Sequence, residues 1–303
     1  MNDTTSMTGK VCLVTGATNG IGKETALALA KMGATTIIVA RDPAKGAAVL
    51  EEIMRQSGND GVELMHADLA SLDSVRKLAA DFQAKHQQLH VLVNNAGVYN
   101  IKRSETQDGF EATFGVNHLS HFLLTNLLLD VIKASAPARI INVSSASHKG
   151  AKINFDDLQS EKSYRGLSVY GQSKLANVLF TYELARRLEG TNVTANALHP
   201  GVVLTGFGAN NAGIFRLLFR VFQTVARPFM LSPERGAETS IHLASSPEVE
   251  GVTAKYFVKK EPVPSNDISN ETDVAQGLWQ MSEEMVKQRT ATHQSTNDDS
   301  ERD

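Results

Sequence analysis

The sequence is poor in cysteine, in net charge and in long apolar runs. One cysteine among 303 residues excludes an internal disulfide and is typical of a reducing compartment. A formal net charge of −3 gives no basic field that would attract nucleic acid. No uninterrupted apolar run reaches about 18 residues, and the N-terminus has neither a charged start nor an apolar stretch. We therefore expect a cytoplasmic protein without a signal peptide or a spanning helix.

What the sequence does contain is a regular alternation of apolar runs and helical patterns. We expect strands near 10–15, 35–40, 62–67, 90–94, 138–144, 192–198 and 254–258. We expect helices near 20–32, 43–57, 71–86, 105–134, 168–189, 232–246 and 269–288. This alternation predicts an α/β fold, a single doubly wound domain with a central parallel sheet flanked by helices. Ligands of such sheets bind beyond the carboxyl ends of the strands.

The chain divides into one domain and two tails. No Pro-, Gly- or Ser-rich linker interrupts residues 9–290, so we expect one domain over that range. Residues 1–8 are expected to form an N-terminal tail. Residues 291–303 are almost entirely polar, cannot bury an apolar face, and are predicted to be disordered.

Tyr170 and Lys174 lie four residues apart at the start of a predicted helix. Residues at this spacing share a helix face, so the phenol and the ammonium can point into one site. A nearby positive charge favours phenolate and lowers the pKa of a tyrosine, which can then transfer a proton near neutral pH. Two surface residues on one helix would show the same spacing, so the pair needs supporting motifs.

A glycine-rich turn follows the first predicted strand, in the run Thr15 to Gly22. A turn of this kind between a strand and a helix N-terminus cradles phosphates with backbone N–H groups. Its spacing is Gly-x-x-x-Gly-x-Gly rather than the Gly-x-Gly-x-x-Gly of most dinucleotide folds. The turn predicts a dinucleotide site.

The end of the second predicted strand bears on the choice of cofactor. Arg41 follows Ala40 there, where an arginine suits a 2′-phosphate and an acidic residue suits a 2′-hydroxyl. Asp42 is adjacent, but Asp42-Pro43 is typical of a helix start. The sequence therefore favours NADP(H), with NAD(H) as the alternative cofactor.

Further motifs follow in a fixed order along the chain. They are Ala67-Asp68-Leu69, Asn94-Asn95-Ala96-Gly97, Asn117, Ser144-Ser145, Tyr170 with Lys174, and Pro200-Gly201 with Thr205. In order and spacing they resemble the motifs of the classical short-chain dehydrogenase/reductase family over roughly residues 8–290. Within that family, stretches 15–26, 116–125 and 173–180 most resemble the retinol-dehydrogenase-like group.

The resemblance implies a Rossmann-type fold and a set of catalytic roles. Tyr170 would donate the proton in carbonyl reduction, and Lys174 would lower its pKa and hold the nicotinamide ribose. Ser145, rather than Ser144, would hydrogen-bond the substrate oxygen. Asn117 would support a water chain from Lys174 to solvent, or alternatively bond its own backbone.

The resemblance also implies a cofactor site, and the sequence predicts no metal site. The expected cofactor-binding residues are Gly16, Asn19, Gly20, Ile21, Gly22, Arg41, Asp68, Leu69, Asn94, Ala96, Gly97, Tyr170, Lys174, Pro200, Val203 and Thr205. His118 and His121 flank a helix face near Asn117, but no cysteine or carboxylate cluster accompanies them.

Residues 205–231 stand where the family carries its substrate lid. The part from 214 to 231 has four phenylalanines, and as a helix it would place its arginines on one narrow stripe. A lid over an apolar substrate, a peripheral membrane contact, and core or subunit packing all fit this pattern.

Two classes of function compete. The first is an NADP(H)-dependent oxidoreductase that interconverts a carbonyl and an alcohol on an apolar aldehyde, ketone, or lipid- or retinoid-like alcohol. The second is a catalytically silent regulator or scaffold of the same fold that binds the cofactor. The complete set of Ser145, Tyr170 and Lys174 favours the enzyme. A sugar epimerase or dehydratase of the extended family would need a longer C-terminal region. By resemblance, a homodimer or homotetramer would pair through the helices carrying Asn117 and Tyr170.

Overall fold

A computed structural model describes residues 6–203 and 230–300 of the chain, with side chains to residue 287. One eight-stranded sheet crosses it, in the order β3-β2-β1-β4-β5-β6-β7-β8. The strands are β1 (Val11–Thr15), β2 (Thr35–Ala40), β3 (Val62–His66), β4 (Val91–Asn94), β5 (Ala138–Val143), β6 (Val193–His199), β7 (Tyr256–Val258) and β8 (Glu261–Val263). Neighbours from β3 to β7 are parallel, and β8 is antiparallel to β7. The doubly wound α/β prediction is confirmed.

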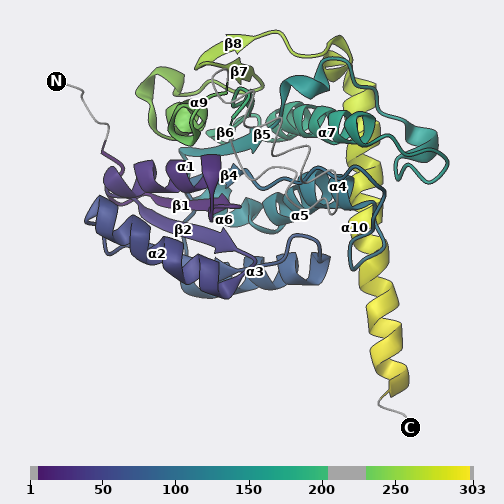
Figure 1. The fold of residues 1–303 in the computed structure, drawn as a ribbon, viewed down its shortest axis with the longest axis horizontal. Helices are drawn as coiled ribbons and strands as arrows, with labels where there is room; N and C mark the ends of the chain where they lie inside the picture. The colour runs from purple at the N-terminus through teal and green to yellow at the C-terminus, as the bar shows by residue number, and fades with distance from the viewer. Residues whose placement is uncertain (1–5, 204–229, 301–303) are drawn as a thin grey trace.

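Helices cover both faces of the sheet (Figure 1). One face carries α1 (Gly20–Lys31), α2 (Pro43–Ser57) and α9 (Pro233–Ser245). The other carries α3 (Leu72–Lys85), α5 (Ser120–Leu127), α7 (Gly166–Arg187) and α10 (Thr272–Ser300). Short helices α4 (Ala112–Phe114) and α6 (Leu129–Ala134) flank α5. The 3-10 helices are η2 (Ala146–His148), η3 (Phe155–Asp157), η5 (Pro247–Val249) and η6 (Asp267–Asn270).

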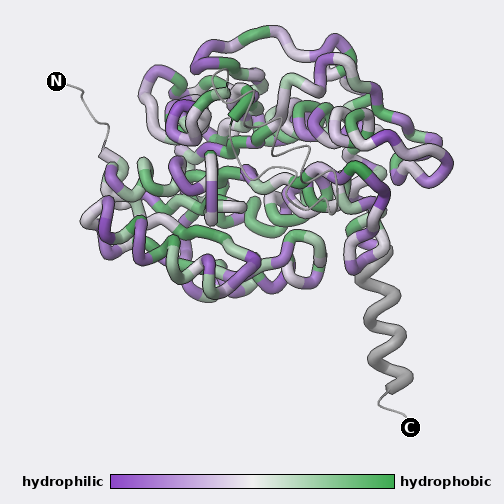
Figure 2. Tube along the Cα trace, viewed as in Figure 1, coloured by the Kyte–Doolittle hydropathy of each residue, from purple (hydrophilic) through white to green (hydrophobic). Residues whose placement is uncertain are grey.

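Strand alternation divides the core between these two helical layers. In β1, Leu13 belongs to the cluster with α3, α5 and α7, while Cys12 and Val14 belong to the cluster with α1 and α2. Because successive side chains of a strand point to opposite faces, a strand buried on both sides must be apolar throughout. Figure 2 shows this as hydrophobic residues along the strands and hydrophilic residues on outer helical surfaces.

The predicted helix 105–134 is interrupted rather than continuous. Residues before Ala112 form a loop, and α4 passes into a π-helical turn, η1 (Gly115–Leu119), before α5 begins. A Cβ on Gly115 would lie 2.7 Å from the Thr106 side chain, so the loop packs closely on the turn. π-turns of this kind are frequent at functional sites, and this one carries Asn117.

The chain ends in α10, whose backbone continues to Ser300 (Figure 1). The disordered tail expected from residue 291 stays a prediction. No glycine or proline follows Gly277 to stop the helix, and the apolar pattern that guided the prediction ends before the helix does.

The helix α10 packs on α5 and α7. The Trp279 ring lies 4.9 Å from that of Phe122 and 5.7 Å from that of Phe180 between centroids, and Arg187 stacks 4.0 Å from it. These contacts belong to one chain, and the pairing of subunits implied by the resemblance stays a prediction. None of the described helices is long and apolar enough to cross a membrane.

Candidate active site

The glycine-rich turn after β1 is packed so closely that two of its glycines, Gly16 and Gly22, cannot be replaced by larger residues without a clash. Gly16 and Gly20 have φ of +64° and +54°, in the region that favours glycine. A Cβ on Gly22 would lie 2.5 Å from the Gly16 carbonyl oxygen, and one on Gly16 would lie 2.9 Å from the Ala96 Cα. These glycines therefore let the turn pack against the segment after β4.

The N-terminus of α1 begins at this turn. Asn19 precedes the helix in an extended conformation, and within the described chain its side chain caps none of the helix N–H groups. The first-turn N–H groups, including that of Ile21, have no intrahelical acceptors and can bind an anion, which the helix dipole also favours. Turn and helix together form a phosphate cradle.

Asn95 holds the glycine turn against β4, a role that the sequence did not assign to it. Its Nδ2 donates to the Thr15 carbonyl oxygen at 2.8 Å, and its backbone N–H donates to Thr15 Oγ1 at 2.9 Å. The Ala96 N–H donates to the same hydroxyl at 3.1 Å. The motif from Asn95 to Gly97 is thus fastened to the end of β1.

Asn94 was predicted to bind cofactor, but its side chain lies inside the protein. It is 1% exposed, and its Nδ2 donates to Thr125 Oγ1 at 2.9 Å and to Asn142 Oδ1 at 2.8 Å. The side chain is therefore held inside the protein, and a contact between Asn94 and the cofactor stays a prediction. Consecutive residues at a strand end point to opposite sides, and here the second asparagine is the one that reaches the glycine turn.

The end of β2 presents Arg41 at the same edge of the sheet. Arg41 is exposed, and among the described residues its side chain makes no ion pair or hydrogen bond. The neighbouring Asp42 caps α2 by accepting from the Lys45 N–H at 3.1 Å. The helix-start interpretation of Asp42 is confirmed, and Arg41 is left available for a phosphate.

The segment after β3 is fixed beside the end of β2. The Ala67 N–H donates to the Ala40 carbonyl oxygen at 3.0 Å. Asp68 Oδ1 accepts from the Ala70 N–H at 3.0 Å, and Asp68 donates its own N–H to Ser74 Oγ at 2.9 Å. Leu69 is buried, with 8% of its surface exposed. Asp68 therefore shapes this loop through its carboxylate and its backbone N–H.

The two serines after β5 face different ways. Ser144 is 2% exposed, and its hydroxyl donates to the Lys174 carbonyl oxygen at 2.7 Å. Ser145 is half-buried, and its hydroxyl hydrogen-bonds the Tyr170 side chain. Its Oγ also accepts from the Ser147 N–H at 3.2 Å. Ser145, the serine chosen from the sequence, is thus the one brought to Tyr170.

Burial dominates the acidity of Tyr170. Desolvation raises the pKa of its phenol to about 12, and the hydrogen bond with Ser145 acts in the opposite direction. We expected Lys174 to lower the pKa of Tyr170, and in this structure that pKa is raised instead. The cost of burying a phenolate outweighs any benefit from the lysine, and the phenol is protonated at neutral pH.

Lys174 lies one helical turn after Tyr170 on α7 and is 3% exposed. Its Nζ donates to the Val143 carbonyl oxygen at 2.9 Å, and a Cβ on Gly97 would lie 3.4 Å from that Nζ. Burial lowers the pKa of the ammonium to about 8. The ammonium therefore donates a hydrogen bond at the carboxyl end of β5. Its pKa of about 8 lies close to neutral pH, so it can exchange a proton more readily than an exposed lysine.

Asn117 fastens the π-turn to the segment after β4. Its Oδ1 accepts from the Val98 N–H at 2.7 Å, and its Nδ2 donates to the Val98 carbonyl oxygen at 3.0 Å and to Ser173 Oγ at 3.0 Å. The side chain thus joins three elements of the site and does not bond its own backbone. The water chain expected through Asn117 stays a prediction.

His121 connects Asn117 to the cofactor turn. Its Nδ1 lies 3.2 Å from the Asn117 carbonyl oxygen and its Nε2 lies 3.0 Å from Thr15 Oγ1. The Asn117 carbonyl oxygen can only accept, so Nδ1–H donates to it and Nε2 of the neutral ring is an acceptor. The Thr15 hydroxyl accepts two N–H groups, and its own proton is shared between Nε2 at 3.0 Å and the Val93 carbonyl oxygen at 3.3 Å. Burial, with the charge of Lys174, lowers the pKa of His121 to about 3.

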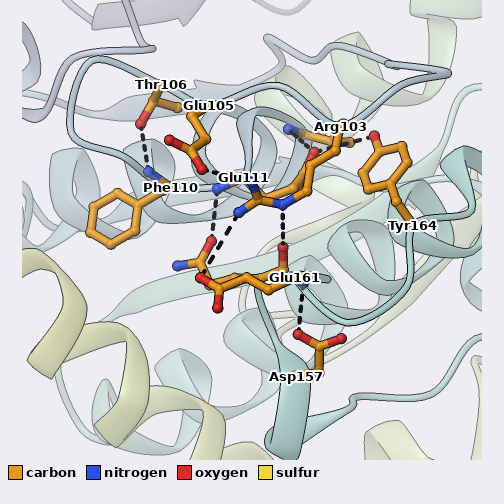
Figure 3. Close-up of polar contacts among 10 residues, drawn as sticks. Arg103, Glu105, Thr106, Phe110, Glu111, Asp157, Glu161 and Tyr164 are labelled. Atoms are coloured by element: carbon orange, nitrogen blue, oxygen red, sulfur yellow. Dashed lines mark hydrogen bonds and ion pairs between the residues drawn. The ribbon is translucent and has the colours of Figure 1, made fainter.

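A polar clamp joins the loop before α4 to the loop before α7 (Figure 3). Glu111 is fully buried, and its carboxylate accepts the Thr113 and Phe114 N–H groups at 2.9 and 2.7 Å and lies 3.3 Å from the Tyr164 hydroxyl. Arg103 donates to the carbonyl oxygen of Gln159 at 3.2 Å. These contacts fix the helix starts that precede Asn117 and Tyr170.

The remaining predicted cofactor residues follow β6. Pro200 and Val203 lie at the edge of the sheet, and the Leu231 N–H donates to the Val202 carbonyl oxygen at 2.8 Å. A Cβ on Gly236 would meet both Val203 and Ile21, so this strand end lies beside the N-terminus of α1. Thr205 and the segment 205–229 of the predicted lid lie outside the described residues.

The closely packed glycine turn, the uncapped α1 and the buried Lys174 fit a dinucleotide. A nicotinamide cofactor would place its phosphates on the turn and its ribose near Tyr170 and Lys174. In the part of the chain that the structure describes, no group of three histidine, cysteine or carboxylate side chains could hold a metal.

Comparison with known proteins agrees with this geometry. The model of the short chain dehydrogenase family matches residues 10–213. Human retinol dehydrogenase 14 is 48% identical over 296 residues, covering 92% of this chain and 87% of that protein. Human retinol dehydrogenase 12 is 47% identical over 280 residues, covering 92% and 86%.

Solved structures show the same fold. An uncharacterised protein of Mycobacterium paratuberculosis superposes with a TM-score of 0.74 at 32% identity, covering 94% of this chain and 96% of that one. RhlG of Pseudomonas aeruginosa, in its NADP active-site complex, gives a TM-score of 0.67 at 27% identity, with 85% and 97% covered.

Proposed function

The chain belongs to the short-chain dehydrogenase/reductase family, in its retinol-dehydrogenase-like group, and on this basis we propose that it is an NADP(H)-dependent oxidoreductase for apolar, retinoid-like carbonyls and alcohols. The observation that carries the proposal is the convergence of Ser145, Tyr170 and Lys174 beside the phosphate cradle. The names of the most similar relatives support the substrate class.

In the proposed reaction Tyr170 gives its phenolic proton to the substrate oxygen. The bound dinucleotide supplies the hydride. Ser145 donates a hydrogen bond to the same oxygen and stabilises the charge that develops there. Because the pKa of Tyr170 is raised to about 12, the phenol carries its proton at neutral pH, which suits the reductive direction.

Lys174 and Asn117 support this proton transfer. In this proposal Lys174 would hold the nicotinamide ribose and return a proton to Tyr170 after each turnover. Asn117 hydrogen-bonds the backbone of Val98, the residue after the Asn95–Gly97 motif, and the hydroxyl of Ser173 on α7. It thus links the segment after β4 to the helix that carries Tyr170. The NADP(H) preference rests on Arg41 at the end of β2.

A panel of aldehydes assayed with NADPH and NADH tests the function. We expect NADPH oxidation with all-trans-retinal and long aliphatic aldehydes, with kcat/KM rising along a chain-length series because each buried CH₂ contributes about 0.8 kcal/mol. A flat chain-length profile would contradict the apolar site, and no oxidation with any aldehyde would favour a silent cofactor-binding scaffold.

The cellular setting of this reaction is also a proposal. We place the enzyme in the cytoplasm, with peripheral membrane contact through residues 214–231, a segment largely outside the described residues. Apolar substrates partition into bilayers, so such contact would raise their local concentration. Co-sedimentation with anionic vesicles, with and without salt, measures it.

A further inference from the structure

His148 is a buried histidine that lies directly behind the catalytic serine. It closes the 3-10 helix η2, which Ser145 caps, and none of its surface is exposed. Its Nδ1 lies 2.6 Å from the Ser145 carbonyl oxygen. On its other side, Nε2 lies 3.2 Å from the backbone nitrogen of Asn266.

The partner of Nε2 settles which ring nitrogen carries the proton. A backbone N–H can only donate, so the Asn266 N–H makes Nε2 an acceptor. A neutral imidazole with an accepting Nε2 has its proton on Nδ1, which then donates to the Ser145 carbonyl. Burial lowers the pKa of His148, which keeps the ring neutral.

The C-terminal segment fixes the ring from behind. Asn266 Nδ2 donates to the carbonyl oxygens of His148, Lys149 and Ala151 at 2.8, 3.1 and 3.0 Å. The Tyr256 ring packs on the imidazole with 4.5 Å between centroids. His148 therefore connects the loop after β8 to the loop of the catalytic serine.

Ser145 needs this support because the sheet no longer holds it. The last ladder bond of this strand end is the Ser144 N–H to the Leu198 carbonyl oxygen at 2.8 Å. Beyond it, the Ser145 carbonyl accepts from the His148 backbone N–H at 3.2 Å and from the ring at 2.6 Å. The shorter bond comes from the ring.

We propose that His148 is a positioning residue for Ser145: its Nδ1–H bond fixes the serine backbone so that Oγ points at Tyr170 and the substrate oxygen. This inference rests on the proposed function. The imidazole touches no reacting atom, because it is fully buried behind the serine loop.

Two variants separate the two ring nitrogens. In His148→Asn the amide can replace the Nδ1 donor, and in His148→Gln it can replace the Nε2 acceptor but not the Nδ1 donor. With NADPH and the best aldehyde of the panel, we expect His148→Asn to keep kcat within about threefold. We expect His148→Gln to lose roughly tenfold in kcat, the effect of about one hydrogen bond, with NADPH affinity unchanged.

A double-mutant cycle with Ser145→Ala shows whether the effect passes through the serine. We expect His148→Gln to cost nothing further in that background, measured by single turnover at high enzyme concentration. Equal losses in both backgrounds, or wild-type kcat in His148→Gln, would overturn the proposal. Asn266→Ala loosens the same loop but keeps the backbone N–H that Nε2 accepts, so we expect Tm to fall and kcat to fall less than in His148→Gln; a larger loss of kcat in Asn266→Ala would overturn the proposal.

The tautomer can be measured without any activity. Imidazole ¹⁵N shifts of His148 in the wild-type protein should show a protonated Nδ1 and a bare Nε2. A protonated Nε2 would overturn the proposal even if both variants failed to fold. Absence of turnover in the wild-type protein would instead refute the proposed function and leave this tautomer result standing.

Discussion

The Lys174 ammonium lies 5.7 Å from the centroid of the Tyr170 ring and donates to the Val143 carbonyl oxygen rather than to the phenol. Burial therefore decides the acidity of both groups. It raises the pKa of Tyr170 to about 12 and lowers that of Lys174 to about 8. At neutral pH the protein holds a protonated phenol beside a poorly solvated cation.

That buried cation should cost stability. The fall of the Lys174 pKa from 10.5 to about 8 corresponds to roughly 3 kcal/mol at pH 7. Lys174→Met removes the charge at similar volume, but it leaves the Val143 carbonyl with one fewer donor, which costs about 1 kcal/mol. We predict that Lys174→Met raises the free energy of unfolding, measured by urea denaturation, by about 1–3 kcal/mol at pH 7. The same variant should have no turnover.

The pH dependence of stability has a definite sign. The pKa of Lys174 is lower in the folded than in the unfolded state, so between pH 8 and 10.5 the unfolded chain binds more protons. Wild-type stability should therefore rise with pH through that window, relative to Lys174→Met. A constant difference between the two proteins from pH 7 to 10 would contradict the buried cation.

The exposed guanidinium of Arg41 leads to a prediction on cofactor choice. Arg41→Ala should weaken NADPH binding about ten- to a hundredfold, because a charge-assisted phosphate contact is worth roughly 1.5–3 kcal/mol, and should leave NADH nearly unchanged. Fluorescence titration with both cofactors measures this. Equal losses for the two, or a wild-type preference for NADH, would refute the role of Arg41.

The close packing of the glycine turn predicts a specific sensitivity. A Cβ at Gly22 would lie 2.5 Å from the Gly16 carbonyl oxygen, so Gly22→Ala must displace the phosphate cradle. We expect its affinity for NADPH to fall at least about tenfold. Gly150→Ala is the matched control, since among described residues a Cβ there meets nothing within 4 Å. Equal affinities in the two variants would disprove the cradle.

Much of the fold follows from local sequence signals. The apolar runs gave the seven parallel strands to within about two residues, because strands buried on both faces are continuous apolar runs. The hairpin to β8 was missed. Its turn residues, Lys259 and Lys260, have φ of +52° and +70°, where glycine or asparagine is the usual signal.

Site residues that belong to a local motif could be predicted from the sequence. Site residues whose role depends on contacts with distant parts of the chain could not. Tyr170 and Lys174 share a helix face through their spacing alone. The roles of Asn95 and His148 depend on partners far away in the chain, Thr15 and Asn266, which no local pattern indicates. The acidity of Tyr170 was predicted in the wrong direction, because burial cannot be read from a four-residue spacing.

The most direct test of the account is the turnover of Tyr170→Phe, measured with NADPH and the best aldehyde of the panel. The ring and its T-shaped contact with Tyr99 at 5.8 Å between centroids can be retained, so NADPH affinity and Tm should stay near wild-type values. Only the proton donor is removed, and we predict that kcat falls by at least about a hundredfold. Turnover near the wild-type rate, in a folded variant that binds NADPH, would contradict the assigned mechanism.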